Sequence, residues 1–233
     1  MLVITVSSPV AGGGIEVGQI VARELGLEYV DQEILLRTAR SLAVPVEEVA
    51  LKDESVARPS GGRLAHLLQA FLERSAAAGS WDPLAGPTGL ENVLGRSYGE
   101  AAALPLGGLD DSTYIRTLRS IIQELATEHS VLIVGRGSQV ILGDLPGALH
   151  TLILAPATLR ISRIAERDGI SLVEATRRVA ALDKSRAEFH HKYFKVEVDD
   201  PYLYNLVVDA SRFSFEDAAG LIVTAARMGA PKG

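Results

Sequence analysis

Residues 2–31 read LVITVSSPVAGGGIEVGQIVARELGLEYVD, and this stretch decides the fold. Residues 2–6 are apolar and mostly β-branched, which favours a strand. After the glycine-rich turn, apolar residues recur at helical spacing, namely Val17, Ile20, Val21 and Leu25. A strand, a glycine-rich turn and a helix in this order bring backbone N–H groups and the positive end of a helix dipole together. The stretch therefore predicts a cradle for a phosphate group.

The predicted cradle lacks the charges that usually accompany it. A phosphate loop of the form GxxxxGK[ST] carries a lysine for the outer phosphates and a hydroxyl for magnesium. Here Gly14 or Ile15 stands in place of the lysine, and Glu16 stands where we place the hydroxyl. A carboxylate at a helix N-terminus satisfies the dipole by itself and repels a triphosphate. A tight turn that binds no ligand therefore remains an alternative interpretation.

Length and composition limit the class of protein. A chain of 233 residues fits one large domain or one domain with a subdomain. The net charge of −6 argues against a general affinity for nucleic acid. The absence of cysteine excludes a disulfide framework and thiolate catalysis. We find neither a signal peptide nor an apolar run of about 20 residues, so we expect a cytoplasmic protein with no membrane partner.

The rest of the chain alternates strands with helices. Further short strands are expected at residues 28–30, 131–134, 149–154 and 206–208. Helices are expected after a cap at Asp31, over residues 64–72, 115–125 and 158–167, and after the capping boxes Ser171-x-x-Glu174 and Ser214-x-x-Asp217. This order predicts an α/β fold, a parallel five-stranded sheet in three layers with helices on both faces. Residues 44–111 follow the second strand and are expected to form a mostly helical insertion.

Arginines from three segments lie near the predicted carboxyl ends of strands, where ligands gather in such sheets. Arg136 follows a strand directly, Arg160 and Arg163 begin the next helix, and Arg178 and Arg186 lie on the long helix after it. Arginine binds phosphate oxygens bidentately, so this pattern is typical of a phosphoryl-transfer site. Solvated arginines paired with neighbouring acids remain the alternative. A dinucleotide fold is disfavoured, because about a hundred residues separate the second and third strands.

Taken in order, these motifs resemble the cytidylate kinase-like proteins of the P-loop nucleoside monophosphate kinase group. The resembling pieces are ITVSSPVAGGGIEVGQIVARELGLEYVD, VLIVGRGSQVIL, LHTLILAPATLRISRIAERDGIS, and DKSRAEFHHKYF leading to YNLVVDAS. They cover most of the chain outside residues 44–111. The resemblance implies transfer of the γ-phosphoryl group of ATP to CMP or dCMP, with Mg²⁺. It also implies one kinase-like domain over residues 1–233, a cover over the monophosphate at 44–111 and a lid at 170–200.

The resemblance implies roles for individual residues. The loop that binds ATP would comprise Ala11, Gly12, Gly13, Gly14 and Glu16. Asp31 would act in catalysis and hold magnesium through water, and the other two catalytic residues would be Arg136 and Arg186. The substrate would be bound by Arg37, Arg136, Arg163, Arg178, Asp183 and Arg186. Within the lid, Asp183 would hold the ribose and Arg186 would span the phosphates.

Two other functions remain open. Ile15 and Glu16 favour a weak or inactive kinase-like protein that binds a nucleotide or a partner. A kinase for another small phosphate acceptor is the second alternative. If the protein is an enzyme, we expect slow turnover unless Lys184 or Arg186 supplies the missing cation. The adjacent histidines, His190 and His191, are expected to be a solvated pair without partners. The sequence defines no oligomeric state.

Overall fold

The computed structural model describes residues 1–54 and 108–229, and the chain divides into two compact units. The first unit comprises Met1–Asp31, Asp53–Ala57 and Ile122–Gly233, and the second comprises Gln32–Lys52 and Arg58–Ile121. The predicted helix over residues 64–72 and residues 55–107 of the predicted cover at 44–111 lie outside the described residues.

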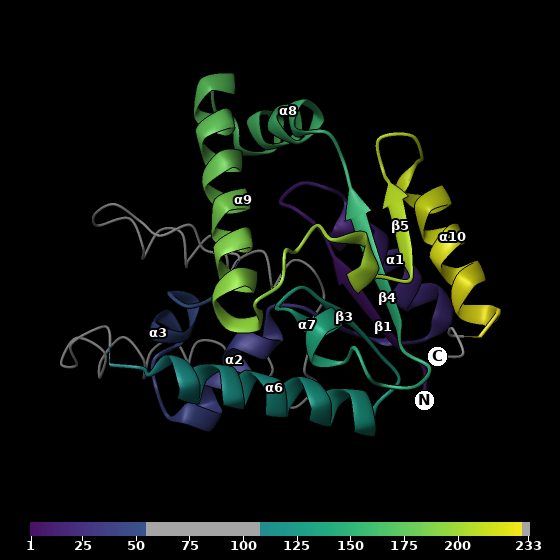
Figure 1. Ribbon diagram of the computed structural model, residues 1–233. Coiled ribbons are helices and arrows are strands. Elements are labelled where there is room, and N and C mark those ends of the chain that lie inside the picture. The colour runs from purple at the N-terminus through teal and green to yellow at the C-terminus, as the bar shows by residue number, and fades with distance from the viewer. Residues whose placement is uncertain (55–107, 230–233) are drawn as a thin grey trace, which may run out of the picture. The chain divides into compact units, whose positions relative to one another are not determined.

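The first unit is built on a five-stranded sheet with the strand order β2-β3-β1-β4-β5. Figure 1 labels four of these strands, β1, β3, β4 and β5. Every pair of neighbouring strands is parallel. The strands are β1 (Val3–Ser7), β2 (Glu28–Val30), β3 (Val131–Val134), β4 (Leu149–Leu154) and β5 (Leu206–Asp209). The structure therefore confirms the predicted α/β fold, and each strand lies within one residue of its predicted position.

Helices connect these strands and cover both faces of the sheet. In the first unit they are α1 (Gly14–Leu25), α7 (Ser138–Ile141), α8 (Ala157–Asp168), α9 (Leu172–Phe194), the 3₁₀ turn η1 (Pro201–Leu203) and α10 (Phe215–Arg227). The main core lies between the sheet and the helix pair α1 and α10, and it buries Ile4, Val6, Val17, Val21, Leu132, Ile153 and Ile222. Helix α8 begins beyond the carboxyl end of β4 (Figure 1). The short helix α7 was not predicted.

Both predicted capping boxes are confirmed, and one predicted cap is wrong. The Ser171 hydroxyl accepts a hydrogen bond from the Glu174 N–H at 3.2 Å, and the Ser214 hydroxyl accepts one from the Asp217 N–H at 3.0 Å. Helix α2 (Glu33–Leu42) instead begins after Gln32 and has no side-chain cap. The Asp31 carboxylate does not cap it, because that carboxylate pairs with Arg136.

The second unit contains α2, the unpredicted helix α3 (Val46–Ala50), and the first part of α6 (Asp111–Glu128). Helix α2 packs against α3. The buried apolar side chains are Ile34, Leu35, Val46, Val49, Tyr114 and Leu118. An ion pair of 2.6 Å between Lys52 Nζ and Asp111 Oδ1 joins the segment after α3 to the start of α6. Among the described residues, none of the helices is long and apolar enough to span a membrane.

Candidate functional site

The loop between β1 and α1 is a turn with unusual backbone angles. Gly12 N–H donates to the Pro9 carbonyl at 2.9 Å, and Gly13 is the N-cap of α1 with φ = 102°. Ala11 has φ = 55°, a left-handed conformation that costs about 1–2 kcal/mol for an L-residue. Strain of this kind is retained where the surrounding structure enforces it, often at ligand sites. The loop thus ends at the N-terminus of α1, where the first N–H groups of a helix have no intrahelical partner, and its binding of phosphate remains a prediction.

The start of α1 carries an acid and no cation. If Gly13 is the last glycine of GxxxxGK[ST], then Ser8 occupies the first glycine position, and Gly14 and Ile15 occupy the lysine and hydroxyl positions. Ile15 and Glu16 are exposed in the first turn of the helix. Positive charge near the loop must therefore come from other segments.

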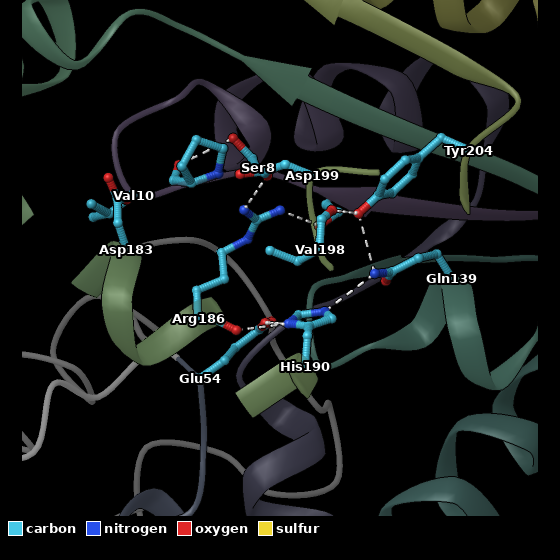
Figure 2. A network of polar contacts seen from close by, with 12 residues as sticks. Ser8, Val10, Glu54, Gln139, Asp183, Arg186, His190, Val198, Asp199 and Tyr204 are labelled. Atoms are coloured by element: carbon cyan, nitrogen blue, oxygen red, sulfur yellow. Dashed lines mark hydrogen bonds and ion pairs between the residues drawn. The ribbon is translucent and has the colours of Figure 1, made fainter. Parts of the chain in front are cut away.

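Arg186 of α9 brings one such charge to the base of the loop (Figure 2). Its guanidinium is buried, and Nη2 donates to the hydroxyl of Ser7, the last residue of β1, at 2.8 Å. Its Nη1 pairs with Asp199 Oδ1 at 2.8 Å. Lys184, the other predicted source of a cation, is exposed and lies 3.7 Å from Glu188. Of the two, only Arg186 contacts the residue that leads into the loop.

Arg160 of α8 pairs with Asp183, the residue predicted to bind the ribose, and also contacts the loop. Its Nη1 and Nη2 each lie 2.8 Å from one carboxylate oxygen of Asp183, which is a bidentate pair. Its Nη1 also donates to the Val10 carbonyl at 3.4 Å, and its Nε donates to the Ala155 carbonyl at 3.1 Å. Asp183 therefore lies beside the loop and is already held by an arginine. Sequence reasoning did not single out Arg160 as the residue that holds it.

Arg163, one turn further along α8, contacts the loop itself. Its Nη1 donates to the Ala11 carbonyl at 2.9 Å, and its guanidinium carbon lies 5.1 Å from the centre of the Phe215 ring. Such a cation–π contact holds a guanidinium while leaving its charge intact. Arg136, Arg160 and Arg186 each pair with a carboxylate. Arg163 pairs with none in the part of the chain that the structure describes. Its charge is therefore available to an anion at the loop.

Arg136 lies at the centre of a buried group of three acids. It has φ = 57° between Gly135 and Gly137, which also have positive φ. Its Nη1 donates to Asp31 Oδ1 at 2.7 Å, its Nε lies 3.3 Å from Asp53 Oδ2, and its backbone N–H bonds the Glu54 carboxylate.

The charges of this group depend on one another. Burial disfavours the charge of Arg136, but the Asp53, Asp31 and Glu54 carboxylates outweigh it and raise the pKa of Arg136. Burial also raises the pKa of Asp31, and the Arg136 guanidinium opposes that shift. Arg136 is thus bound by three acids just beyond the carboxyl end of β3. Asp53 and Glu54 were not predicted, because nothing in the local sequence links them to Arg136.

A magnesium ion would need a bound ligand to complete its coordination here. Among residues 1–54 and 108–229, no three His, Asp or Glu side chains form a metal-binding group. Magnesium usually binds one or two carboxylates together with substrate phosphates and water. Asp31 already bonds Arg136 through Oδ1, so contact of this carboxylate with magnesium through water remains a prediction.

Two predicted binding residues make their described contacts elsewhere. Arg178 Nη1 donates to Asp168 Oδ2 at 2.6 Å, at the end of α8, and Arg167 shares the same carboxylate. Arg37 pairs with Glu33 within α2 of the second unit at 2.6 Å. The described contacts of Arg178 therefore join α9 to the end of α8, and the described contact of Arg37 lies within α2.

The prediction that His190 is solvated is wrong, whereas His191 is exposed. His190 is fully buried, with Nε2 3.2 Å from Gln139 Nε2 and Nδ1 2.9 Å from the Arg186 carbonyl (Figure 2). Its Nδ1 also lies 3.3 Å from a Glu54 carboxylate oxygen. A signal was present in the sequence, because buried residues of α9 recur at helical spacing, namely Ala175, Val179, Arg186 and His190.

Comparisons with known proteins find relatives that are named as cytidylate kinases. A cytidylate kinase from Methanopyrus kandleri is 35% identical over 111 residues, which are 44% of this chain and 58% of that protein. A cytidylate kinase from Aeropyrum pernix is 36% identical over 76 residues, 33% of this chain and 44% of that protein. The chain thus spans about half the length of these curated relatives.

A solved structure and a family model extend the comparison to nearly the whole chain. An uncharacterized protein from Eubacterium ventriosum ATCC 27560 has the same fold, with a TM-score of 0.62 and 17% identity over 97% of this chain and 99% of that one. The model of the cytidylate kinase-like family matches residues 3–212. The chain belongs to the cytidylate kinase-like family.

Proposed function

We propose that this protein is a nucleoside monophosphate kinase that transfers the γ-phosphoryl group of ATP to CMP or dCMP. The observation that carries the proposal is that Arg160 and Arg163 donate to carbonyls of the loop between β1 and α1, and that Arg186 donates to Ser7 directly before it. Phosphoryl transfer needs positioning and positive charge around the phosphates, and little covalent chemistry from the protein. The family, and the relatives named as cytidylate kinases, support the choice of acceptor.

In this proposal the loop binds ATP, and arginines of the helices stabilise the charge of its transferred phosphoryl group. N–H groups of residues 11–14 and Glu16 at the start of α1 border the triphosphate. Arg163 and Arg186 stabilise the charge that develops on the transferred group. Asp31 holds magnesium through water, and the ion when bound neutralises phosphate charge and orients the donor.

The same proposal assigns the acceptor to other residues. Arg37, Arg136 and Arg178 bind the monophosphate, or orient the segments around it. Asp183 retains acceptor positions for a ribose hydroxyl while it is bound to Arg160, because a carboxylate has about four lone-pair sites.

We expect slow turnover, because the loop itself has no cation. Removing one group that stabilises transition-state charge commonly costs about 3 kcal/mol. Lys184 is paired with Glu188, so Arg163 and Arg186 would have to make up the loss.

A coupled assay of ADP formation tests the proposal. ADP should form from ATP and Mg²⁺ when CMP or dCMP is added, and Arg163→Gln should lower the rate at least tenfold. The matched control is Arg167→Gln, one turn later on α8, where the side chain bonds Asp168 and makes no described contact with the loop. The proposal is contradicted if ADP forms neither with CMP nor with dCMP. ADP formation with another small acceptor instead would favour the kinase of different specificity.

A nucleotide-binding protein without kinase activity is the second candidate. The observation that favours it is the first turn of α1, where Gly14, Ile15 and Glu16 replace the lysine and the hydroxyl. Thermal unfolding with each ligand separates the two functions, since a ligand that binds only the native state raises the melting temperature. Stabilisation by CMP but not by ATP with Mg²⁺, without ADP formation, would favour this candidate.

A further inference from the structure

The side chain of Ser8 fills the space beside two loop glycines. A Cβ atom added to Gly14 would lie 2.4 Å from Ser8 Cβ and 3.1 Å from its Oγ. A Cβ added to Gly12 would lie 2.4 Å from the same Oγ and 2.8 Å from the Pro9 carbonyl. Cβ atoms do not approach this closely, and Ser8 Cβ is fixed by the backbone and has no rotamer that moves it away. A side chain at position 14 is therefore excluded as long as Ser8 is present.

This packing reverses the usual arrangement of a phosphate loop. The pattern GxxxxGK[ST] has glycine at the position of Ser8 and lysine at the position of Gly14. We propose that Ser8 and Gly14 form a matched pair that keeps a lysine out of the loop, and that Arg163 provides the loop's positive charge from α8. The second part rests on the proposed function, in that the loop binds phosphate.

Two contacts fix Arg163 for this role. Its guanidinium donates to the carbonyl of Ala11 inside the loop, and it lies over the Phe215 ring. The same ring lies against Gly13, because a Cβ at Gly13 would be 2.9 Å from Phe215 Cε1. One aromatic side chain thus positions both the end of the loop and the cation beside it. Among the described residues, no carboxylate neutralises that cation.

The first experiment measures thermal unfolding of Gly14→Lys, Ser8→Gly and the double variant. Gly14→Lys should lower the melting temperature by roughly 5 °C or more, as expected for a clash in a packed region. Ser8→Gly alone should change it less, and adding Ser8→Gly to Gly14→Lys should restore most of the loss. A double variant that melts no higher than Gly14→Lys would overturn the matched pair, as would a Gly14→Lys protein as stable as the wild type.

The second experiment measures binding of tripolyphosphate, and of ATP with Mg²⁺, by calorimetry. Arg163→Gln should weaken tripolyphosphate binding about tenfold or more, because a hydrogen bond to a charged group is lost. Introducing Ser8→Gly and Gly14→Lys into Arg163→Gln should recover much of that affinity, and Arg163→Lys should retain part of it. The control Arg167→Gln should bind as the wild type does.

The outcomes separate this inference from the proposed function. Binding that is unaffected by Arg163→Gln, or no recovery with the loop lysine in a folded variant, overturns the role of Arg163 but leaves the kinase proposal standing. Tripolyphosphate binding that Arg163→Gln weakens, in a protein that does not bind ATP, contradicts the kinase proposal and supports the role of Arg163. Binding of neither probe contradicts both, and the unfolding experiment still decides the matched pair.

Discussion

The phosphate loop and the helix pair α8 and α9 differ in how they use their residues. The loop, residues 8–13, contains no cation, its backbone has positive φ at Ala11 and Gly13, and in the proposed function its N–H groups bind an anion. The helices have regular backbone, and their arginine side chains contact the loop through Arg160 and Arg163 and contact Ser7, directly before it, through Arg186. The comparison shows that the shape of an anion site and its charge can come from separate parts of a chain.

Neighbouring strands connect these two regions. β1 leads into the loop, and its partner β4 leads into α8. The Thr5 hydroxyl and His150 Nδ1 lie 2.8 Å apart between these strands, and the Thr151 hydroxyl donates to the Thr5 carbonyl at 2.8 Å. Substitutions in the loop, in α8 and α9, or in the contacts between β1 and β4 therefore test how far the two regions depend on each other.

Removing Arg160 should have the largest effect on stability. Arg160→Leu leaves Asp183 without its bidentate partner and removes the donor to the Val10 carbonyl. Breaking a buried ion pair costs about 3–5 kcal/mol. Asp183 is 35% exposed, so we expect the lower end, roughly 3 kcal/mol. Urea unfolding measures the loss.

The control for Arg160 is another arginine–carboxylate pair, from α9 to the end of α8. Arg178→Leu removes the pair with Asp168, where the arginine side chain is 30% exposed. Partly exposed pairs are worth about 1 kcal/mol or less. If the two variants lose the same free energy of unfolding, then Arg160 does not hold the helices to the loop.

The second prediction concerns activity and depends on the proposed function. Arg186→Gln removes the buried charge that contacts Ser7 and should lower kcat about 100-fold, in the range found for a single group that stabilises charge. Ser7→Ala removes only the hydroxyl that orients this arginine and should lower kcat less, about tenfold. Steady-state kinetics checks both variants. An Arg186→Gln enzyme with unchanged kcat would confine the arginine to a structural role.

The third prediction tests the backbone of the loop with two glycines at the ends of α1. Gly13→Ala places a Cβ 2.9 Å from the Phe215 ring at φ = 102°, whereas Gly26→Ala at φ = 65° meets nothing within 4 Å. Gly26→Ala should cost about 1 kcal/mol from backbone strain alone. Gly13→Ala should cost about 1 kcal/mol more, because the ring must move. Equal losses in urea unfolding would show that Phe215 does not restrict the loop.

The fold was predictable from sequence because its signals are local. Apolar β-branched runs located all five strands, and Ser171 and Ser214 marked two helix starts through contacts three residues away. The first strand was expected at residues 2–6 and is found at Val3–Ser7, because Ser7 could belong either to the strand or to the loop after it.

The pairing of charges was not predictable, because the partners are far apart in the chain. Arg160 and Asp183 are 23 residues apart, and Arg136 and Glu54 are 82 residues apart. No periodicity in the sequence relates such pairs, since only the packing of the strands and helices brings them together. The same reason explains Asp31, which was expected to cap the following helix and instead binds Arg136. The charged residues in the sequence indicated a site, and the packing of strands and helices determined which arginine pairs with which carboxylate.

The smallest effect is expected at the link between β1 and β4. His150 is buried, and burial lowers the pKa of its imidazole. Burial disfavours the protonated imidazole in the folded state. The folded state therefore has its full stability above the unfolded pKa of about 6.5, and it loses stability as the pH falls from there through the lowered folded pKa. The wild type should therefore lose stability on acidification below about pH 6.5, and His150→Gln should lose less over the same range. Melting temperatures measured from pH 7.5 to pH 5 give the two curves. Since other groups titrate in both proteins, the difference between the curves isolates His150. Parallel curves would show that His150 does not make the contact between the loop strand and the helix strand sensitive to pH.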